Sequence, residues 1–181
     1  MKKTALMCAM ILVVSAASAL AAGKTAYVDT QVIFEKTSLG KKYQGIVREY
    51  VESRKKLLDV DYEEIQKLQE EYNKQRQAKA LNEKAQRAKE ETLNSKINAF
   101  QRKRDEFSAE IAKKNEELSN EFSQKMMEVL KVIAKKEKIS LILSKSINLQ
   151  KAETHLVLYA DDDMNLTEKV IAEMDKREGA K

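Results

Sequence analysis

Between residues 46 and 178 the chain contains neither glycine nor proline, and residues 46–138 are rich in charge with only a sparse apolar pattern. Without helix-breaking residues this stretch can be continuously helical. Its apolar positions are too few to bury it in a globular core. One helix of this length would extend on the order of 140 Å, and a hairpin folded once would reach roughly 60–80 Å. We therefore expect residues 46–138 to form a helical hairpin arm.

Apolar residues in this region recur every seven positions, as they do in a coiled coil. The rows are Val51, Leu58, Ile65 and Tyr72 with Val47, Arg54, Asp61 and Leu68 in the first helix, and Leu93, Phe100, Phe107 and Lys114 with Ile97, Arg104, Ile111 and Leu118 in the second. Charged residues in such a seam reduce its stability, so we expect two helices that are only loosely held together. Residues 79–83 are the expected reversal, because Asn82 is a favourable helix N-cap.

The two ends of the chain have the patterns of a small body. Residues 25–29 (TAYVD), 139–143 (ISLIL) and 155–159 (HLVLY) are predicted strands. Asn165 and Glu168 have the spacing of a capping box, which predicts a final helix over residues 166–177. The expected fold class is α+β, mostly α, with an arm that projects from a small β-rich body.

That body is assigned to residues 23–45 and 139–177, followed by a disordered tail at residues 178–181. It is too small for a substantial core, and its sheet would leave unpaired edges. We infer an oligomer that joins several bodies. The copy number does not follow from these considerations.

The first 22 residues have the organisation of an export signal. Lys2 and Lys3 precede an apolar run at residues 5–14, and Ala19 and Ala21 supply a small-x-small cleavage pattern. We expect cleavage after Ala21 or Ala22 and localisation in the periplasm. The single cysteine lies in this signal, so the mature chain is expected to have no disulfide and no cysteine-based metal site.

Positive charge is concentrated where the hairpin is expected to reverse. Residues 73–104 contain ten basic residues and three acidic ones. The candidates for anionic contact at this basic tip are Lys74, Arg76, Lys79, Lys84, Arg87 and Lys89. Such a tip would attract anionic surfaces over about 8 Å at physiological salt. Export argues against nucleic acid as the partner, and a merely solvated helix turn is the alternative.

Residues that could carry out catalysis are sparse. The chain has one histidine, His155, and its four glycines are too dispersed for a phosphate-binding loop. Residues 161–165 (DDDMN) match the start of a calcium loop, but Leu166 stands where glycine is needed and Ala172 where glutamate is needed. We expect no enzyme activity, no cofactor and no metal.

Aromatic residues spaced along the arm are the remaining candidates for function. They are Tyr50, Tyr62, Tyr72, Phe100 and Phe107. Such rings either pack helix against helix or provide weak contacts to a non-native client protein. Many weak contacts suit a chaperone that retains unfolded chains and so prevents their aggregation.

The order of these segments resembles the Skp (OmpH-like) family of periplasmic chaperones over essentially the whole mature chain. The resemblance is carried by residues 25–29, by Ala99 with Phe100, and by residues 165–171, in addition to the order and length of the segments. It implies a jellyfish-shaped homotrimer with a β-barrel body. It also implies that unfolded outer-membrane β-barrel proteins are held without ATP before membrane insertion, and that lipopolysaccharide is a further ligand.

The leading hypothesis is therefore a periplasmic holdase that holds its clients through arm aromatics and uses basic tips to attract acidic clients or anionic membrane. One alternative is an exported coiled-coil structural or envelope-spacer protein without clients. A third possibility is a protein that binds peptidoglycan or a lipid surface through the basic tip.

Overall fold

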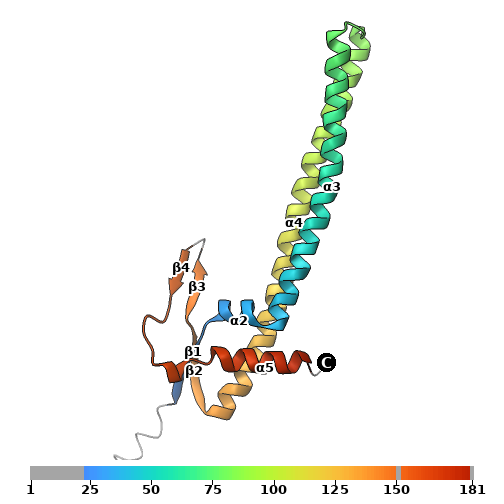
Figure 1. Cartoon of the computed structure of the whole chain (residues 1–181). Helices are drawn as coiled ribbons and strands as arrows, with labels where there is room; N and C mark the ends of the chain where they lie inside the picture. Colours follow the sequence, from blue (N-terminus) through green and yellow to red (C-terminus); the bar gives the residue numbers. More distant parts are fainter. Residues whose placement is uncertain (1–22, 150–151, 180–181) are drawn as a thin grey trace, which may run out of the picture. The chain divides into compact units, whose positions relative to one another are not determined.

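The computed structural model describes residues 23–149 and 152–179. The expected export signal lies outside these residues, as does part of the expected tail. The elements are β1 (Lys24–Val28), α2 (Thr30–Lys36), α3 (Ser38–Gln77), α4 (Glu83–Glu137), β2 (Ile139–Ser144), β3 (Ser146–Leu149), β4 (Ala152–His155), the 3₁₀ helix η2 (Asp162–Met164) and α5 (Thr167–Gly179) (Figure 1). The α+β, mostly helical class is confirmed. No helix of the described part has both the length and the apolar character that crossing a membrane requires.

The chain divides into two compact units, and the boundary falls within α3 and α4. One unit, Lys42–Glu121, is the hairpin. The other, here called the base, comprises the described residues through Lys41 and those from Phe122 onward. The first segment of the base therefore ends at Lys41, four residues before the expected boundary at residue 45, and the base also includes the last four turns or so of α4, which were expected in the arm.

The first and last segments of the base are joined through β1. Strand β1 pairs in parallel with β2, with Tyr27 opposite Leu143. The backbone N–H of Leu166 donates to the carbonyl of Tyr27 at 2.9 Å, and the N–H of Asp29 donates to Oγ1 of Thr167 at 2.9 Å. These bonds fix the start of α5 beside the end of β1.

The core of the base lies among α2, α4 and α5. Its most completely buried side chains are Ile33, Thr37, Val129, Leu166 and Val170. The rings of Phe34 and Phe122 meet edge to face with their centroids 4.9 Å apart, a favoured arrangement of two aromatic quadrupoles. The dense apolar spacing at the end of α4 thus serves the base.

The prediction of a strand at residues 155–159 is wrong. The polar segment before it forms the antiparallel pair β3–β4 instead, and only His155 of the expected strand is included. The backbone N–H groups of Leu156 and Val157 both donate to the carbonyl of Lys145. The apolar run consequently has no neighbouring strand within the described chain, and Leu158 and Tyr159 are 91% and 86% exposed.

The transitions next to β2 and α5 have local causes. Lys138 adopts a left-handed conformation, φ 57°, between α4 and β2, which ends the helix. Oδ1 of Asn165 accepts a hydrogen bond from the N–H of Thr167 at 3.0 Å. The last helix begins at Thr167 and reaches Gly179, so it is displaced by one or two residues from the expected range.

Candidate functional site

The hairpin consists of the antiparallel parts of α3 and α4. Ile65 and Tyr72 of α3, seven residues apart, and Leu118 of α4 are buried in its seam, as the heptad rows of the sequence predict. Helix α3 ends at Gln77 and α4 begins at Glu83, on either side of the segment expected to reverse. Lys79 has a φ of 49°, and Oδ1 of Asn82 accepts from the N–H of Ala85 at 2.8 Å. A left-handed lysine and an asparagine cap thus make this turn without glycine or proline.

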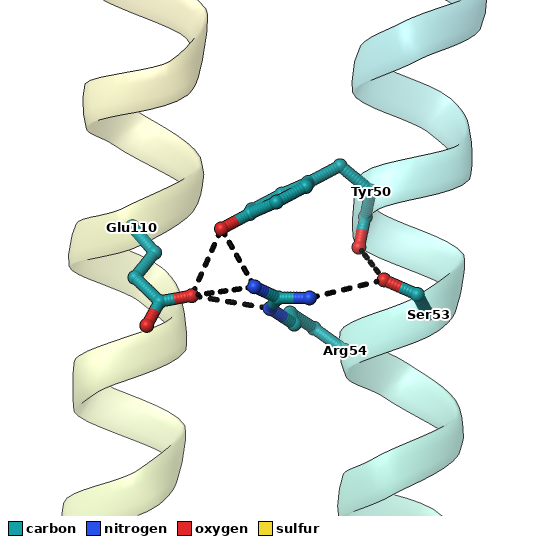
Figure 2. Close-up of polar contacts among 4 residues, drawn as sticks. All are labelled: Tyr50, Ser53, Arg54 and Glu110. Carbon is teal, nitrogen blue, oxygen red and sulfur yellow. Dashed lines mark hydrogen bonds and ion pairs between the residues drawn. The ribbon is translucent and has the colours of Figure 1, made fainter.

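A polar cluster joins the two helices at Glu110 (Figure 2). Its Oε2 accepts from the hydroxyl of Tyr50 at 3.0 Å and from Nε and Nη2 of Arg54 at 3.1 and 3.0 Å. Nη2 of Arg54 also donates to the hydroxyl oxygen of Tyr50 at 2.8 Å. The guanidinium lies 4.1 Å from the ring centroid of Tyr50 and 5.4 Å from that of Phe107. The carboxylate of Glu110 therefore holds the hydroxyl of Tyr50 and the guanidinium of Arg54 together, and the ring of Phe107 lies beside that guanidinium.

Two more ion pairs cross the hairpin nearer its turn. Nζ of Lys103 lies 2.6 Å from Oδ2 of Asp61. Nζ of Lys96 lies 2.8 Å from Oε1 of Glu64. The intervals 50–57–64 in α3 and 96–103–110 in α4 are each seven residues, so these rows follow one side of the seam. We call this side the ion-paired edge, defined by Tyr50, Arg54, Asp61, Glu64, Lys96, Lys103 and Glu110.

The charged seam positions differ from the expectation in one important respect. Arg54 and Asp61 each meet an opposite charge on the other helix, so these charges connect the helices. Arg104, expected in the seam, is exposed, and Lys103 is the residue that turns toward the partner helix. The seam closes through matched charges, although ion pairs as exposed as these contribute only modestly to stability.

The five candidate aromatic residues have different surroundings. Tyr72 is buried, and its hydroxyl donates to Oε1 of Glu90. Tyr50 belongs to the Glu110 cluster, and the half-buried Phe107 lies beneath the cations of Arg54 and Lys103. The rings of these three residues are therefore engaged inside the hairpin.

Tyr62 and Phe100 have a more accessible arrangement. Their ring centroids are 6.1 Å apart and their planes are tilted by 40°. Tyr62 is 51% exposed, and Ile97 about one turn further toward the tip and Val51 about three turns further toward the base are 40% and 38% exposed. Val51 and Ile97 were expected in the seam, and their partial exposure was not predicted from the apolar rows.

The tyrosine–glutamate contacts shift the ionisation of both partners. The hydrogen bond from Tyr50, followed by that from Arg54, lowers the pKa of Glu110 below its usual value. The hydrogen bond to Glu110 in turn raises the pKa of Tyr50. Similarly, the bond between Tyr72 and Glu90 lowers the pKa of the glutamate and raises that of the tyrosine. Near neutral pH each pair is held as a neutral phenol donating to a carboxylate.

The basic tip residues lie on both sides of the reversal. Lys74 and Arg76 are in the last turn of α3, where positive charge complements the helix dipole. Two of the six are paired within their own helix, Lys74 with Glu70 at 2.6 Å and Arg87 with Glu83 at 3.9 Å. In the described part of the chain, no carboxylate pairs with Lys79, Lys84 or Lys89. All except Lys89, which is half-buried, are exposed.

Among residues 23–149 and 152–179, no group of three or more His, Cys, Asp or Glu side chains is placed to bind a metal ion. The acidic run that resembled a calcium loop forms η2 and leads into the cap of α5. The exposed Tyr62, Val51 and Ile97 make the surface of the hairpin the candidate functional site.

A long antiparallel helical hairpin with a small strand-containing base defines the class of protein, an α+β chain whose hairpin surface is available for contact. The family model described as "Outer membrane protein (OmpH-like)" matches residues 24–174, and the chain belongs to this family. The resemblance drawn from the sequence is confirmed at the level of the family.

The fold is also found in a crystal structure from Caulobacter crescentus CB15, described as that of an OmpH-like outer membrane chaperone. The two chains share 16% sequence identity with a TM-score of 0.74, and the match covers 87% of this chain and 86% of that one. No curated protein matches the sequence.

Proposed function

We propose that this protein is an ATP-independent holdase chaperone of the periplasm, which binds unfolded outer-membrane β-barrel proteins and prevents their aggregation before insertion. Membership of the OmpH-like family supports a chaperone role. The description of the Caulobacter protein as an outer membrane chaperone agrees with it. The single observation that carries the proposal is the hairpin surface, where partly exposed apolar side chains are separated by charged ones.

This surface has the properties that a holdase needs. Val51, Tyr62 and Ile97 offer small apolar areas at separate heights along the hairpin. Each contact is weak because only part of each side chain is accessible. Several weak contacts along one chain add through effective concentration and still allow exchange. Binding the unfolded state in this way competes with its aggregation without recognising a particular sequence.

The exposed apolar surface of the base supports an oligomer as the functional form, and the family resemblance makes a homotrimer the proposed one. Leu141 and Leu143 are 50% and 39% exposed on β2, and Leu158 and Tyr159 are almost fully exposed. An apolar groove of about 410 Å³ runs along β2 and the end of α4, with Met126 and Leu130 among its lining residues. Exposed apolar surface of this kind marks interaction sites, and additional strands from other copies would cover it.

The exported location and the basic tip complete the proposal. The leader with its cleavage pattern near Ala21 or Ala22 directs the chain to the periplasm. The exposed lysines near the turn give the tip its attraction for anionic lipid, lipopolysaccharide or acidic client segments.

Light scattering tests the central proposal. A urea-unfolded outer-membrane β-barrel protein is diluted out of urea with and without one trimer equivalent of this protein, and an unrelated soluble protein at equal mass serves as control. We expect scattering to fall to a small fraction of the control value. Unchanged aggregation would contradict the holdase function and favour an envelope-spacer role. Sedimentation at micromolar concentration tests the trimer, which a monomer would exclude.

A further inference from the structure

The two edges of the hairpin carry different kinds of side chain. On the side of the seam opposite the ion-paired edge, each helix has one row of residues at intervals of seven. The rows are Arg48, Lys55, Tyr62, Gln69 and Arg76 on α3, and Arg87, Asn94, Gln101, Ser108 and Asn115 on α4. We call them the cationic edge. All ten side chains are exposed, and neither row contains a carboxylate.

Positive charge on this edge is available to a partner. Arg48 and Lys55 form no ion pair with any described carboxylate, whereas the ion-paired edge joins Lys96 and Lys103 to acidic residues of α3. Arg104, beside the edge, is exposed and has only Asp105 of its own helix, at 3.9 Å. Lys96 and Lys103 of the ion-paired edge are thus matched across the hairpin. On the cationic edge, Arg48, Lys55 and Arg76 face solvent, and Arg87 has only Glu83 of its own helix, at 3.9 Å.

Apolar surface accompanies these cations. Tyr62 belongs to the cationic edge itself, and its ring packs against that of Phe100. Val51 and Ile97 border it with 38% and 40% of their surfaces exposed. The antiparallel pairing that sets Tyr62 level with Phe100 also places Ile97 level with Ile65, about one turn further toward the tip. The edge therefore has cations toward both of its ends, Arg48 and Lys55 at one and Arg76 and Arg87 at the other, with the exposed Tyr62 between them.

We propose that the cationic edge is the surface that holds clients, and that it selects non-native segments in which apolar side chains alternate with Asp or Glu. This inference rests on the proposed holdase function and adds to it the binding face and the chemistry of the bound segment. Charge complementarity carries it, because Arg48, Lys55 and Arg76 of the edge have no ion-pair partner among the described residues. Among the five candidate aromatics it assigns client contact to Tyr62 and Phe100, and it adds Val51 and Ile97.

A second copy of the hairpin is a less suitable occupant. A stable helical partner needs an uninterrupted series of apolar residues at coiled-coil spacing. Here Tyr62 is flanked in its row by Lys55 and Gln69, so a packed helix would bury polar groups without partners. An extended chain can place apolar side chains at Tyr62 and Ile97 and leave the intervening groups hydrated.

The test uses two fluorescent peptides with the same alternating apolar residues, one with acidic and one with basic residues between them. Binding to the full mature chain is followed by fluorescence anisotropy. The apolar variant combines Tyr62→Ser with Ile97→Ser, and its control combines Leu57→Ser with Val60→Ser, two exposed apolar residues outside the edge. The charge variant combines Arg48→Gln with Lys55→Gln, and its control combines Lys56→Gln with Lys67→Gln. Far-ultraviolet circular dichroism verifies that each variant is folded.

We expect the acidic peptide to bind about tenfold more weakly to either edge variant and within about twofold of the original affinity to either control. The basic peptide should bind weakly throughout. Equal losses in edge and control variants, or equal binding of the two peptides, would overturn the proposal. A photoreactive residue at position 62 that captures a second copy of the chain, and not the peptide, would overturn it as well.

Failure of the edge assignment can be distinguished from failure of the holdase function. If the unmodified protein suppresses aggregation and the edge variants suppress it equally well, the assignment alone is wrong. If the unmodified protein neither binds the acidic peptide nor suppresses aggregation, the holdase function and the assignment fail together.

Discussion

The hydroxyl of Tyr50 and the carboxylate of Glu110 meet across the hairpin at 3.0 Å, although 60 positions separate them in the sequence. Arg54 donates to the same carboxylate oxygen, so that oxygen accepts bonds from two side chains of α3. This contact fixes the register of the two helices far from the turn that joins them, and it can be removed with one substitution.

Glu110→Gln should lower the melting temperature by a few degrees at neutral pH, because the amide loses the charge that Arg54 and Tyr50 contact. Glu63→Gln is the matched control, since Glu63 is an exposed carboxylate of α3 that lies outside the seam. Thermal unfolding followed by circular dichroism measures both. Equal melting temperatures for the two variants would show that the cluster does not stabilise the hairpin.

Acidification should weaken the same contact. The pKa of Glu110 is lowered in the folded hairpin relative to the ordinary value of 4.5, as is that of Glu90. Their contribution to stability is therefore complete above the unfolded value and is lost as pH falls from about 4.5 through the folded pKa. Urea unfolding at several pH values should show a shallower loss in a Glu90→Gln, Glu110→Gln variant than in the original protein. An identical pH profile would contradict the role of these carboxylates.

Reversing the ion pair of Asp61 and Lys103 tests whether matched charges close the seam. Asp61→Lys and Lys103→Asp should each destabilise the hairpin, and the double variant should recover part of the loss. For a half-exposed pair we expect a coupling energy of about 0.2–1 kcal/mol. The double-mutant cycle is measured by urea unfolding at low salt. A coupling energy of zero would show that the two charges interact only with solvent.

Gly40 and Gly45 provide a matched pair in α3. A Cβ at Gly40 would lie 1.7 Å from the carbonyl oxygen of Phe34, whereas one at Gly45 would have no neighbour within 4 Å. Gly40→Ala should force α2 and α3 apart and destabilise the base. Gly45→Ala should stabilise the helix by roughly 0.5–1 kcal/mol, because alanine restricts the unfolded chain. Chemical denaturation at one fixed protein concentration compares them, and equal effects would contradict the close approach at Gly40.

Removing charge from the basic tip tests its attraction for anions. Lys79→Gln, Lys84→Gln, Arg87→Gln and Lys89→Gln together should weaken binding to anionic vesicles and reduce its dependence on salt. The control replaces Lys113, Lys131, Lys135 and Lys136 by glutamine, which removes the same charge elsewhere on α4. Vesicle co-sedimentation at two salt concentrations measures both. If the two variants bind equally well, the tip has no special role.

Much of the hairpin follows from the sequence because local rules determine it. The absence of glycine and proline predicts the long helices, and Asn82 indicates where the second one begins. The spacing of Ile65 and Tyr72 identifies the seam. These signals act over one or two turns and do not depend on distant residues.

The conformation of residues 156–159 and the ion pairs across the seam depend on contacts between distant residues, which sequence patterns do not encode. Residues 156–159 have the composition of a strand, but a strand needs a neighbour, and within one chain none is available to them. The choice of Lys103 over Arg104 follows from a small rotation of α4 that brings Nζ to Asp61. Tyr72 is buried because it belongs to the seam row of Ile65, whereas Tyr62 lies outside both apolar rows of α3 and is exposed, so the spacing already distinguishes these two aromatics.

The three ion pairs that the described residues make across the hairpin all lie along one edge, and this determines how the two helices can separate. Rolling apart about that edge preserves Glu110–Arg54, Asp61–Lys103 and Glu64–Lys96, while it widens the gap beside Tyr62 and Ile97. Separation by this route would leave α3 and α4 attached through the three ion pairs.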